Sequence, residues 1–101
     1  MKSGAELIAM ERERQIMQEG YSEERDEAHD HGELAGAAAC YALWNCGYIG
    51  KFTWRLAMAL WPFDELDWKP KDPVRDLVRA GALIAAEIDR MQRLEKPKII
   101  T

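Results

Sequence analysis

The chain has 101 residues, 48% of them hydrophobic and 32% charged, which suits a single domain, residues 1–101, with one modest core. Its net charge of −4 is unevenly spread, because residues 1–33 contain four Lys and Arg against ten Asp and Glu, whereas residues 34–101 contain ten against eight. An acidic chain argues against duplex nucleic acid as a partner, since that binding depends on clustered cations. The apolar content argues against a disordered chain.

The N-terminal residues do not form the apolar core of a signal peptide, because acidic residues begin at Glu6 and recur from Glu11. Cys40 and Cys46 are the only cysteines, and their spacing matches neither a zinc motif nor a secreted disulfide framework. We therefore expect a cytoplasmic protein with no membrane segment, in which Cys40 behaves as a small hydrophobic residue.

The first predicted helix runs over 4–18. Ser3 followed three residues later by Glu6 is a capping box, and Gly20 is well placed to end the helix in a left-handed turn. A helical period places the polar residues Glu11, Arg14 and Gln15 on the same side as the apolar ends of this helix. These groups either pair in the interior and line a pocket, or form a solvated middle turn.

The centre of the sequence is an uncharged run, Leu34–Trp44, which is shorter than the ~20 residues that span a bilayer and predicts a buried core helix. Asp30 followed by Glu33 predicts a capping box at its start. Residues 20–33 are expected to form a loop or one short turn of helix. The turn signal at 45–47 ends the core helix.

Two further helices are predicted. Thr53 is the expected cap of a short helix that ends before Pro62. Asp72 followed by Pro73 predicts the start of a last helix over 73–94. The apolar stripe of this last helix recurs at steps of four, three, four and three residues: Leu77, Gly81, Ile84, Ile88 and Met91. Residues 96–101 are expected to be a frayed tail, and no strand pattern is longer than 97–101. The predicted fold class is all-α, a small bundle of three to four helices.

Aromatic and cationic side chains gather in the proline-rich loop before the last helix. Trp61 and Trp68 could stack bases, while Lys69, Lys71 and Arg75 could hold phosphates. The alternative is that the tryptophans plug the end of the helical bundle.

A second candidate set is acidic and imidazole-bearing. Oxygen-rich clusters of this kind bind Mg²⁺ or Mn²⁺, but the spacing is not diagnostic, and a solvated capping loop is the alternative. The set comprises Asp26, Glu27, His29, Asp30, His31 and Glu33. A third set, Asp76 and Glu87, shares one face of the last helix and is expected to pair with Arg12 or Arg14 across the bundle.

Three segments, E-R-E-R-Q-I-M-Q-E-G-Y, H-D-H-G-E-L-A-G-A-A-A-C-Y-A-L and W-K-P-K-D-P-V-R-D-L-V-R-A-G-A-L-I-A-A-E-I-D-R, together resemble a family of small phage and prophage proteins without an established activity. The resemblance covers roughly residues 6–93. It implies a phage accessory protein that acts in the cytoplasm of an infected bacterium.

Two functional classes fit such a protein. The chain is similar in kind to phage sponges that sequester cyclic nucleotide signals of bacterial immunity, usually at a subunit interface. It is also similar to MazG-like all-α nucleotide pyrophosphohydrolases, which hold Mg²⁺ with E-x-x-E and E-x-x-D helices. Here Glu24 and Glu27 have the first spacing but lie in the loop, and the last helix has no E-x-x-D.

We therefore expect a binding protein rather than an enzyme: an anti-defence homo-oligomer that captures a nucleotide-class ligand, such as a cyclic dinucleotide, without cleaving it and without a cofactor. The alternatives are a Mg²⁺-dependent pyrophosphohydrolase and an inhibitor that acts by protein–protein contact. The expected ligand-binding residues are Arg14, His29, His31, Trp61, Trp68, Lys69, Lys71 and Arg75. The metal ligands, if the enzyme alternative holds, are Glu11, Asp30, Glu33 and Asp76.

Overall fold

The computed structural model describes residues 1–46 and 51–95, and these residues form helices and connecting loops with no strand. The all-α fold class is confirmed. The predicted tail at 96–101, the weak strand pattern at 97–101 and the end of the turn at Gly47 lie outside the described residues. The elements are α1 (Gly4–Gln18), α2 (Glu23–Glu27), α3 (Glu33–Trp44), α4 (Lys51–Leu60), the short 3₁₀ helix η2 (Glu65–Asp67) and α5 (Pro73–Glu95).

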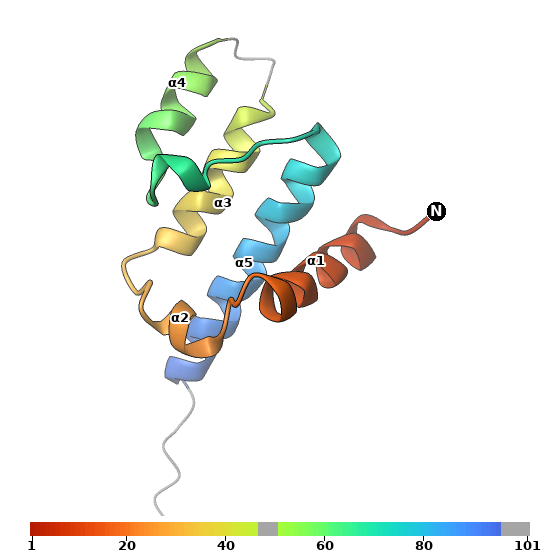
Figure 1. Ribbon diagram of the computed structural model, residues 1–101, viewed down its shortest axis with the longest axis vertical. Helices are drawn as coiled ribbons and strands as arrows, with labels where there is room; N and C mark the ends of the chain where they lie inside the picture. Colours follow the sequence, from red (N-terminus) through yellow and green to blue (C-terminus); the bar gives the residue numbers. More distant parts are fainter. Residues whose placement is uncertain (47–50, 96–101) are drawn as a thin grey trace, which may run out of the picture.

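The central pair of helices is α3 and α5, which lie side by side and run in opposite directions (Figure 1). Arg79 donates a hydrogen bond to the Tyr41 hydroxyl at 3.2 Å, and the Asn45 side chain donates to Asp76 at 3.3 Å. Helix α1 packs on α5, α4 packs on α3, and α2 lies against the C-terminal part of α5. Within the described residues, no helix has both the length and the apolar character needed to cross a membrane.

Small side chains make up most of the contact between α3 and α5. The buried cluster contains only three larger residues, Leu34, Tyr41 and Leu83. Its other members are alanines, which let two helix backbones approach closely: Ala37, Ala38, Ala80 and Ala86. The prediction that the run 34–44 is a core helix is confirmed, with Cys40 fully buried, although Ala35 and Ala39 remain exposed.

The predicted apolar stripe of the last helix does not face this core. An apolar stripe is normally the packed face of a helix, but Leu77, Ile84, Ile88 and Met91 are each 49–50% exposed. The face of α5 that packs on α3 and α1 instead carries Asp76, Ala80, Ala82, Leu83, Ala86, Glu87 and Arg90. This face can be buried without the aliphatic stripe, because its alanines pack with Leu83 and its carboxylates have partners, Asn45 and Lys71 for Asp76 and Arg90 for Glu87.

Two helix starts agree with the capping residues predicted from the sequence. The Ser3 hydroxyl accepts a hydrogen bond from the Glu6 N–H at 3.1 Å, and the Glu6 carboxylate accepts one from the Ser3 N–H at 3.4 Å. The Asp72 carboxylate accepts a hydrogen bond from the Arg75 N–H at 2.9 Å, which caps α5 immediately before Pro73. Gly20 has a φ of 72°, as the predicted left-handed turn requires.

Two other helix starts differ from the prediction. The residue before α3 is Gly32, with a φ of 86° and no side-chain cap, so the capping box between Asp30 and Glu33 is wrong. The Glu33 carboxylate accepts a hydrogen bond from the His31 N–H at 2.6 Å instead. Helix α4 begins at Lys51, so Thr53 is not its cap but a buried residue within it.

Gly81 lies where α1 comes closest to α5, and its substitution tests that packing. A Cβ atom at Gly81 would stand 2.5 Å from Ile8 Cδ1 and 2.7 Å from Ile8 Cγ1. We predict that Gly81→Ala lowers the free energy of unfolding, measured by urea denaturation, because overpacking costs about 1–3 kcal/mol and outweighs the gain of up to about 1 kcal/mol in helix propensity.

Gly36→Ala is the matched control, because its Cβ would meet only Pro62 Cγ at 3.8 Å. This variant should stabilise the chain by up to about 1 kcal/mol. In an Ile8→Ala background, Gly81→Ala should also become stabilising. If Gly81→Ala stabilised the unmodified chain as much as Gly36→Ala does, the close approach would be absent.

Candidate ligand-binding site

A hollow of about 180 Å³ lies where the C-terminal end of α1, the helix α3, the loop after α4 and the helix α5 meet. Its lining combines aromatic rings with cationic side chains, and these come from segments that are far apart in the sequence. The lining residues are Arg14, Gln15, Glu19, Tyr21, Arg25, Ala37, Tyr41, Trp61, Phe63, Asp67, Lys69, Arg79 and Leu83.

The aromatic wall of the hollow is built on α3. The ring of Tyr41 packs edge-on against Trp61 at 5.6 Å and lies 4.8 Å from Trp68. Trp61 also packs against Phe63 at 5.6 Å, and its indole N–H donates a hydrogen bond to the Asp64 carbonyl at 2.9 Å. These contacts hold the rings in place while leaving Trp61 and Phe63 partly exposed.

Three arginines hold fixed positions around the hollow. The segment between α4 and α5, residues 61–72, is called the aromatic loop. Arg79 donates to the Lys69 carbonyl at 2.9 Å, which ties this loop to α5. The guanidinium of Arg25 lies 3.8 Å from the centre of the Tyr21 ring, in cation–π geometry. Each guanidinium has five N–H donors, so Arg25 and Arg79 retain donors beyond these contacts.

Arg14 lies between two carboxylates. It donates to Glu11 at 2.7 and 2.8 Å and to Glu19 at 2.9 Å, and these hydrogen bonds raise the pKa of Arg14. Glu11 is only 3% exposed. Burial alone would raise the pKa of the Glu11 carboxyl, but the hydrogen bonds and charge of Arg14, with the charge of Arg75, outweigh burial and hold that pKa below its ordinary value. The polar middle of α1 is therefore paired in the interior and reaches the hollow.

Of the eight residues expected to bind ligand, the structure brings Arg14, Trp61 and Lys69 to the hollow. Trp68 packs behind the wall, 4.8 Å from Trp61, which agrees with the alternative that tryptophans fill the end of the bundle. Arg75 also lies outside the lining, and its guanidinium is 3.6 Å from the Glu11 carboxylate.

The other three expected residues lie outside the lining. His29 packs on Phe63 at 5.0 Å and lies 3.6 Å from Glu33. His31 is exposed beside Asp30, and the exposed Lys71 uses its backbone N–H to bind Asp76 at 2.7 Å.

Sequence reasoning missed much of the lining. Five lining residues were not expected to bind ligand, and they are spread along the sequence: Tyr21, Arg25, Tyr41, Phe63 and Arg79. The spacing of four residues between Tyr21 and Arg25 was the only local signal among them. Nothing in the sequence places α2 beside the aromatic loop.

The four residues considered as metal ligands do not come together. Asp30 contacts His31, Glu33 contacts His29, and Glu11 contacts Arg14. Within residues 1–46 and 51–95, no three His, Cys, Asp or Glu side chains are grouped so that they could hold a metal ion.

The expected pairing of Asp76 and Glu87 with Arg12 or Arg14 is wrong. Glu87 pairs with Arg90 on its own helix at 2.6 Å, and Asp76 accepts hydrogen bonds from Lys71 and Asn45. Arg12 pairs instead with Asp26 and Asp89, and Arg14 pairs with Glu11 and Glu19.

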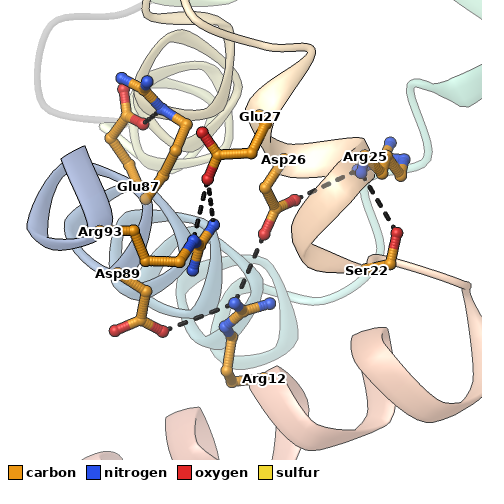
Figure 2. Close-up of polar contacts among 9 residues, drawn as sticks. Arg12, Ser22, Arg25, Asp26, Glu27, Glu87, Asp89 and Arg93 are labelled. Atoms are coloured by element: carbon orange, nitrogen blue, oxygen red, sulfur yellow. Dashed lines mark hydrogen bonds and ion pairs between the residues drawn. The ribbon is translucent and has the colours of Figure 1, made fainter. Parts of the chain in front are cut away.

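A second polar cluster attaches α2 to α1 and α5 (Figure 2). Asp26 has no exposed surface and accepts a hydrogen bond from Arg12 at 3.4 Å, and Arg12 also reaches Asp89 at 3.5 Å. Arg93 donates to Glu27 at 2.8 Å. Burial raises the pKa of Asp26 above its ordinary value, against the opposing charge of Arg12. This cluster joins α1, α2 and α5.

The two buried carboxylates should give opposite pH dependences of stability. The pKa of Glu11 is lowered on folding, so its contribution is present above the unfolded pKa of about 4.3 and is lost as the pH falls through the folded pKa. The pKa of Asp26 is raised, so its contribution is present below the unfolded pKa of about 3.9 and is lost as the pH rises through the folded pKa.

Urea denaturation at several pH values tests these directions. The destabilisation by Glu11→Gln should grow with pH to about 1.5–3 kcal/mol near neutrality, the range for a hydrogen bond to a charged group. Asp26→Asn should become more favourable relative to the unmodified chain as the pH rises. Glu13→Gln, on the exposed side of α1, is the control for the loss of one carboxylate from this helix. The same slope for both buried variants would contradict the assignment.

Comparison of the chain with protein-family models, with curated proteins and with solved structures found no match. The resemblance of its three segments to small phage and prophage proteins stays a prediction. Evidence for a function comes from the residues that line the hollow and from their charge.

Proposed function

We propose that this protein binds a nucleotide-class ligand in the hollow, an aromatic ring system that carries phosphate, and holds it without cleaving it. One observation carries the proposal. Four cationic side chains and two acidic ones line the hollow beside partly exposed aromatic rings, although the whole chain has a net charge of −4. The cationic lining residues are Arg14, Arg25, Lys69 and Arg79, and the acidic ones are Glu19 and Asp67.

The two parts of such a ligand have distinct partners in this arrangement. A base would stack on the partly exposed rings of Trp61 and Phe63, since every base offers a π-face to an aromatic side chain. A phosphate would bind Lys69 and the remaining donors of Arg79, which the Lys69 carbonyl already positions beside the rings. Arg14 contributes less, because Glu11 and Glu19 occupy its guanidinium.

The volume of the hollow limits the ligand. Sites for drug-sized ligands have volumes of about 300–1,000 Å³, and the hollow has about 180 Å³. It therefore suits one base or one phosphate-bearing end. A cyclic dinucleotide would have to extend into a second copy of the chain, in agreement with the expected homo-oligomer.

The sequence resemblance suggests a biological role for this binding. The protein would act as a phage anti-defence protein that sequesters an immune signal in the cytoplasm of an infected bacterium. Two alternatives remain distinguishable by experiment. A Mg²⁺-dependent pyrophosphohydrolase would release product from a nucleoside triphosphate, and a protein–protein inhibitor would bind no nucleotide.

A ligand panel tests the proposal directly. The purified chain is dialysed against nucleoside mono-, di- and triphosphates and cyclic dinucleotides, with and without Mg²⁺, and the bound material is analysed after heat denaturation. Retention of an intact compound is the expected result. Metal-dependent release of pyrophosphate would support the enzyme instead. Absence of both retention and turnover would overturn nucleotide binding.

Two lysines on the same loop provide a matched pair of variants. Lys69 lines the hollow, whereas Lys71 is exposed and outside it. Lys69→Ala should raise the Kd of the retained compound about tenfold or more, because a charge-assisted hydrogen bond contributes about 1.5–3 kcal/mol. Lys71→Ala should change the Kd less than Lys69→Ala, because Lys71 does not line the hollow and its exposed charge acts only through attraction that salt screens. Equal losses in both variants would indicate general electrostatic attraction rather than a site.

A further inference from the structure

Gln15 places an unpaired hydrogen-bond acceptor in the wall of the hollow. The residue lines the hollow from α1 and is only 2% exposed. Its amide Nε2 donates a hydrogen bond to Glu11 at 3.3 Å, but its carbonyl Oε1 is buried and has no partner within the described residues. Buried polar atoms are nearly always paired, because an unpaired one has lost its hydrogen bonds to water and gained none in return. We therefore expect the partner of Oε1 to come from whatever occupies the hollow.

Glu11 determines which end of the Gln15 amide is unpaired. The Glu11 carboxylate accepts hydrogen bonds from Arg14 at 2.7 and 2.8 Å as well as from Gln15. Burial raises the pKa of this carboxyl, but the contacts with Arg14 outweigh burial and hold the pKa below its ordinary value, so the group is ionised at neutral pH. Turning the amide over would set its carbonyl oxygen against this carboxylate, with no proton between two acceptors. Oε1 therefore stays an acceptor, and its partner must be a donor.

The arginines of the lining do not supply that donor. Arg14 donates to two carboxylates, and Arg79 donates to the Tyr41 hydroxyl and the Lys69 carbonyl. A second acceptor of the lining, the carboxylate of Asp67, is exposed and makes no hydrogen bond within the described part of the chain. The hollow therefore offers two open acceptors as well as cationic donors beside its aromatic rings.

We propose that the base held in the hollow is guanine and that Gln15 Oε1 accepts a hydrogen bond from its 2-amino group. This inference rests on the proposed nucleotide binding and specifies the base. Guanine has two adjacent donors, N1–H and the 2-amino group, on one edge and the acceptors O6 and N7 on another. The donor edge suits Gln15 and Asp67, and the acceptor edge suits the remaining donors of Arg25, since arginine is the common partner of O6 and N7. The 2-amino group projects from the ring, so it can reach an acceptor recessed in the wall.

The other bases match these acceptors less well. Adenine and cytosine have an amino group next to a ring nitrogen that is itself an acceptor, so one of the two open acceptors would face another acceptor. Uracil and thymine have a single N–H between two carbonyl oxygens. Hypoxanthine is guanine without the 2-amino group, so its nucleotide isolates the contact with Gln15.

The affinities of the unmodified chain for GMP and IMP test the assignment. Equilibrium dialysis should give a Kd for GMP at least about tenfold lower than that for IMP, because IMP leaves the buried Oε1 of Gln15 unpaired. AMP should also bind at least about tenfold more weakly than GMP. Equal Kd values for GMP and IMP, or tighter binding of AMP, would overturn this inference and leave nucleotide binding intact. Retention of no nucleotide would overturn both.

A variant of Gln15 tests the residue itself. Gln15→Met keeps the length of the side chain but removes the acceptor, so the preference for GMP over IMP should fall to about twofold or less through weaker binding of GMP, with unchanged helical circular dichroism. Gln18→Met is the matched control, because Gln18 is exposed at the end of α1 and does not line the hollow. It should keep the full preference. A preference for GMP that survives Gln15→Met would overturn the role of Gln15.

Discussion

The close, alanine-lined contact between α3 and α5 is the constraint on which the rest of the structure depends. Alanines at Ala37, Ala38, Ala80 and Ala86 bring the two helices together. Leu34, Tyr41 and Leu83 are the larger members of the buried cluster, and Trp61, Phe63 and Trp68 pack against it from the aromatic loop. This packing, together with α1 and α2, encloses the hollow. The aliphatic side chains of α5 lie on its outer side and are about half exposed.

The features of the fold that the sequence predicted correctly are those that depend on interactions between residues a few positions apart. Ser3 with Glu6, and Asp72 with Pro73, act on neighbouring backbone groups, so their helices begin where the pattern indicates. The capping box at Asp30 was wrong because a glycine with positive φ already turns the chain at Gly32. The stripe of α5 was correctly recognised as apolar, but periodicity cannot say which face a helix buries. Which face α5 buries depends on its contacts with α3 and α1, which come from distant parts of the chain.

The candidate site was predicted only in part, for a related reason. The aromatic and cationic composition of the loop pointed to Trp61 and Lys69, and the polar middle of α1 pointed to Arg14. The remaining members come from α2, α3 and α5, and only the packing of these helices brings Arg25 and Arg79 to the same hollow. Conversely, Lys71 and Arg75 are near in sequence but point elsewhere, because Asp76 and Glu11 hold that part of the chain.

Helix α1 is attached in a different manner from the central pair. Its only buried residues are Glu11 and Gln15, and its links to α2 and α5 include the ion pairs of Arg12 with Asp26 and Asp89. The pair of Arg12 with Asp89 is partly exposed, so dissolved electrolyte weakens it, whereas the buried pair with Asp26 and the alanine packing respond much less. Rising ionic strength should therefore loosen α1 first, as a local opening below the global unfolding threshold. Because α1 and the turn after it supply Arg14 and Tyr21, one wall of the hollow is the part of the molecule most responsive to its salt environment.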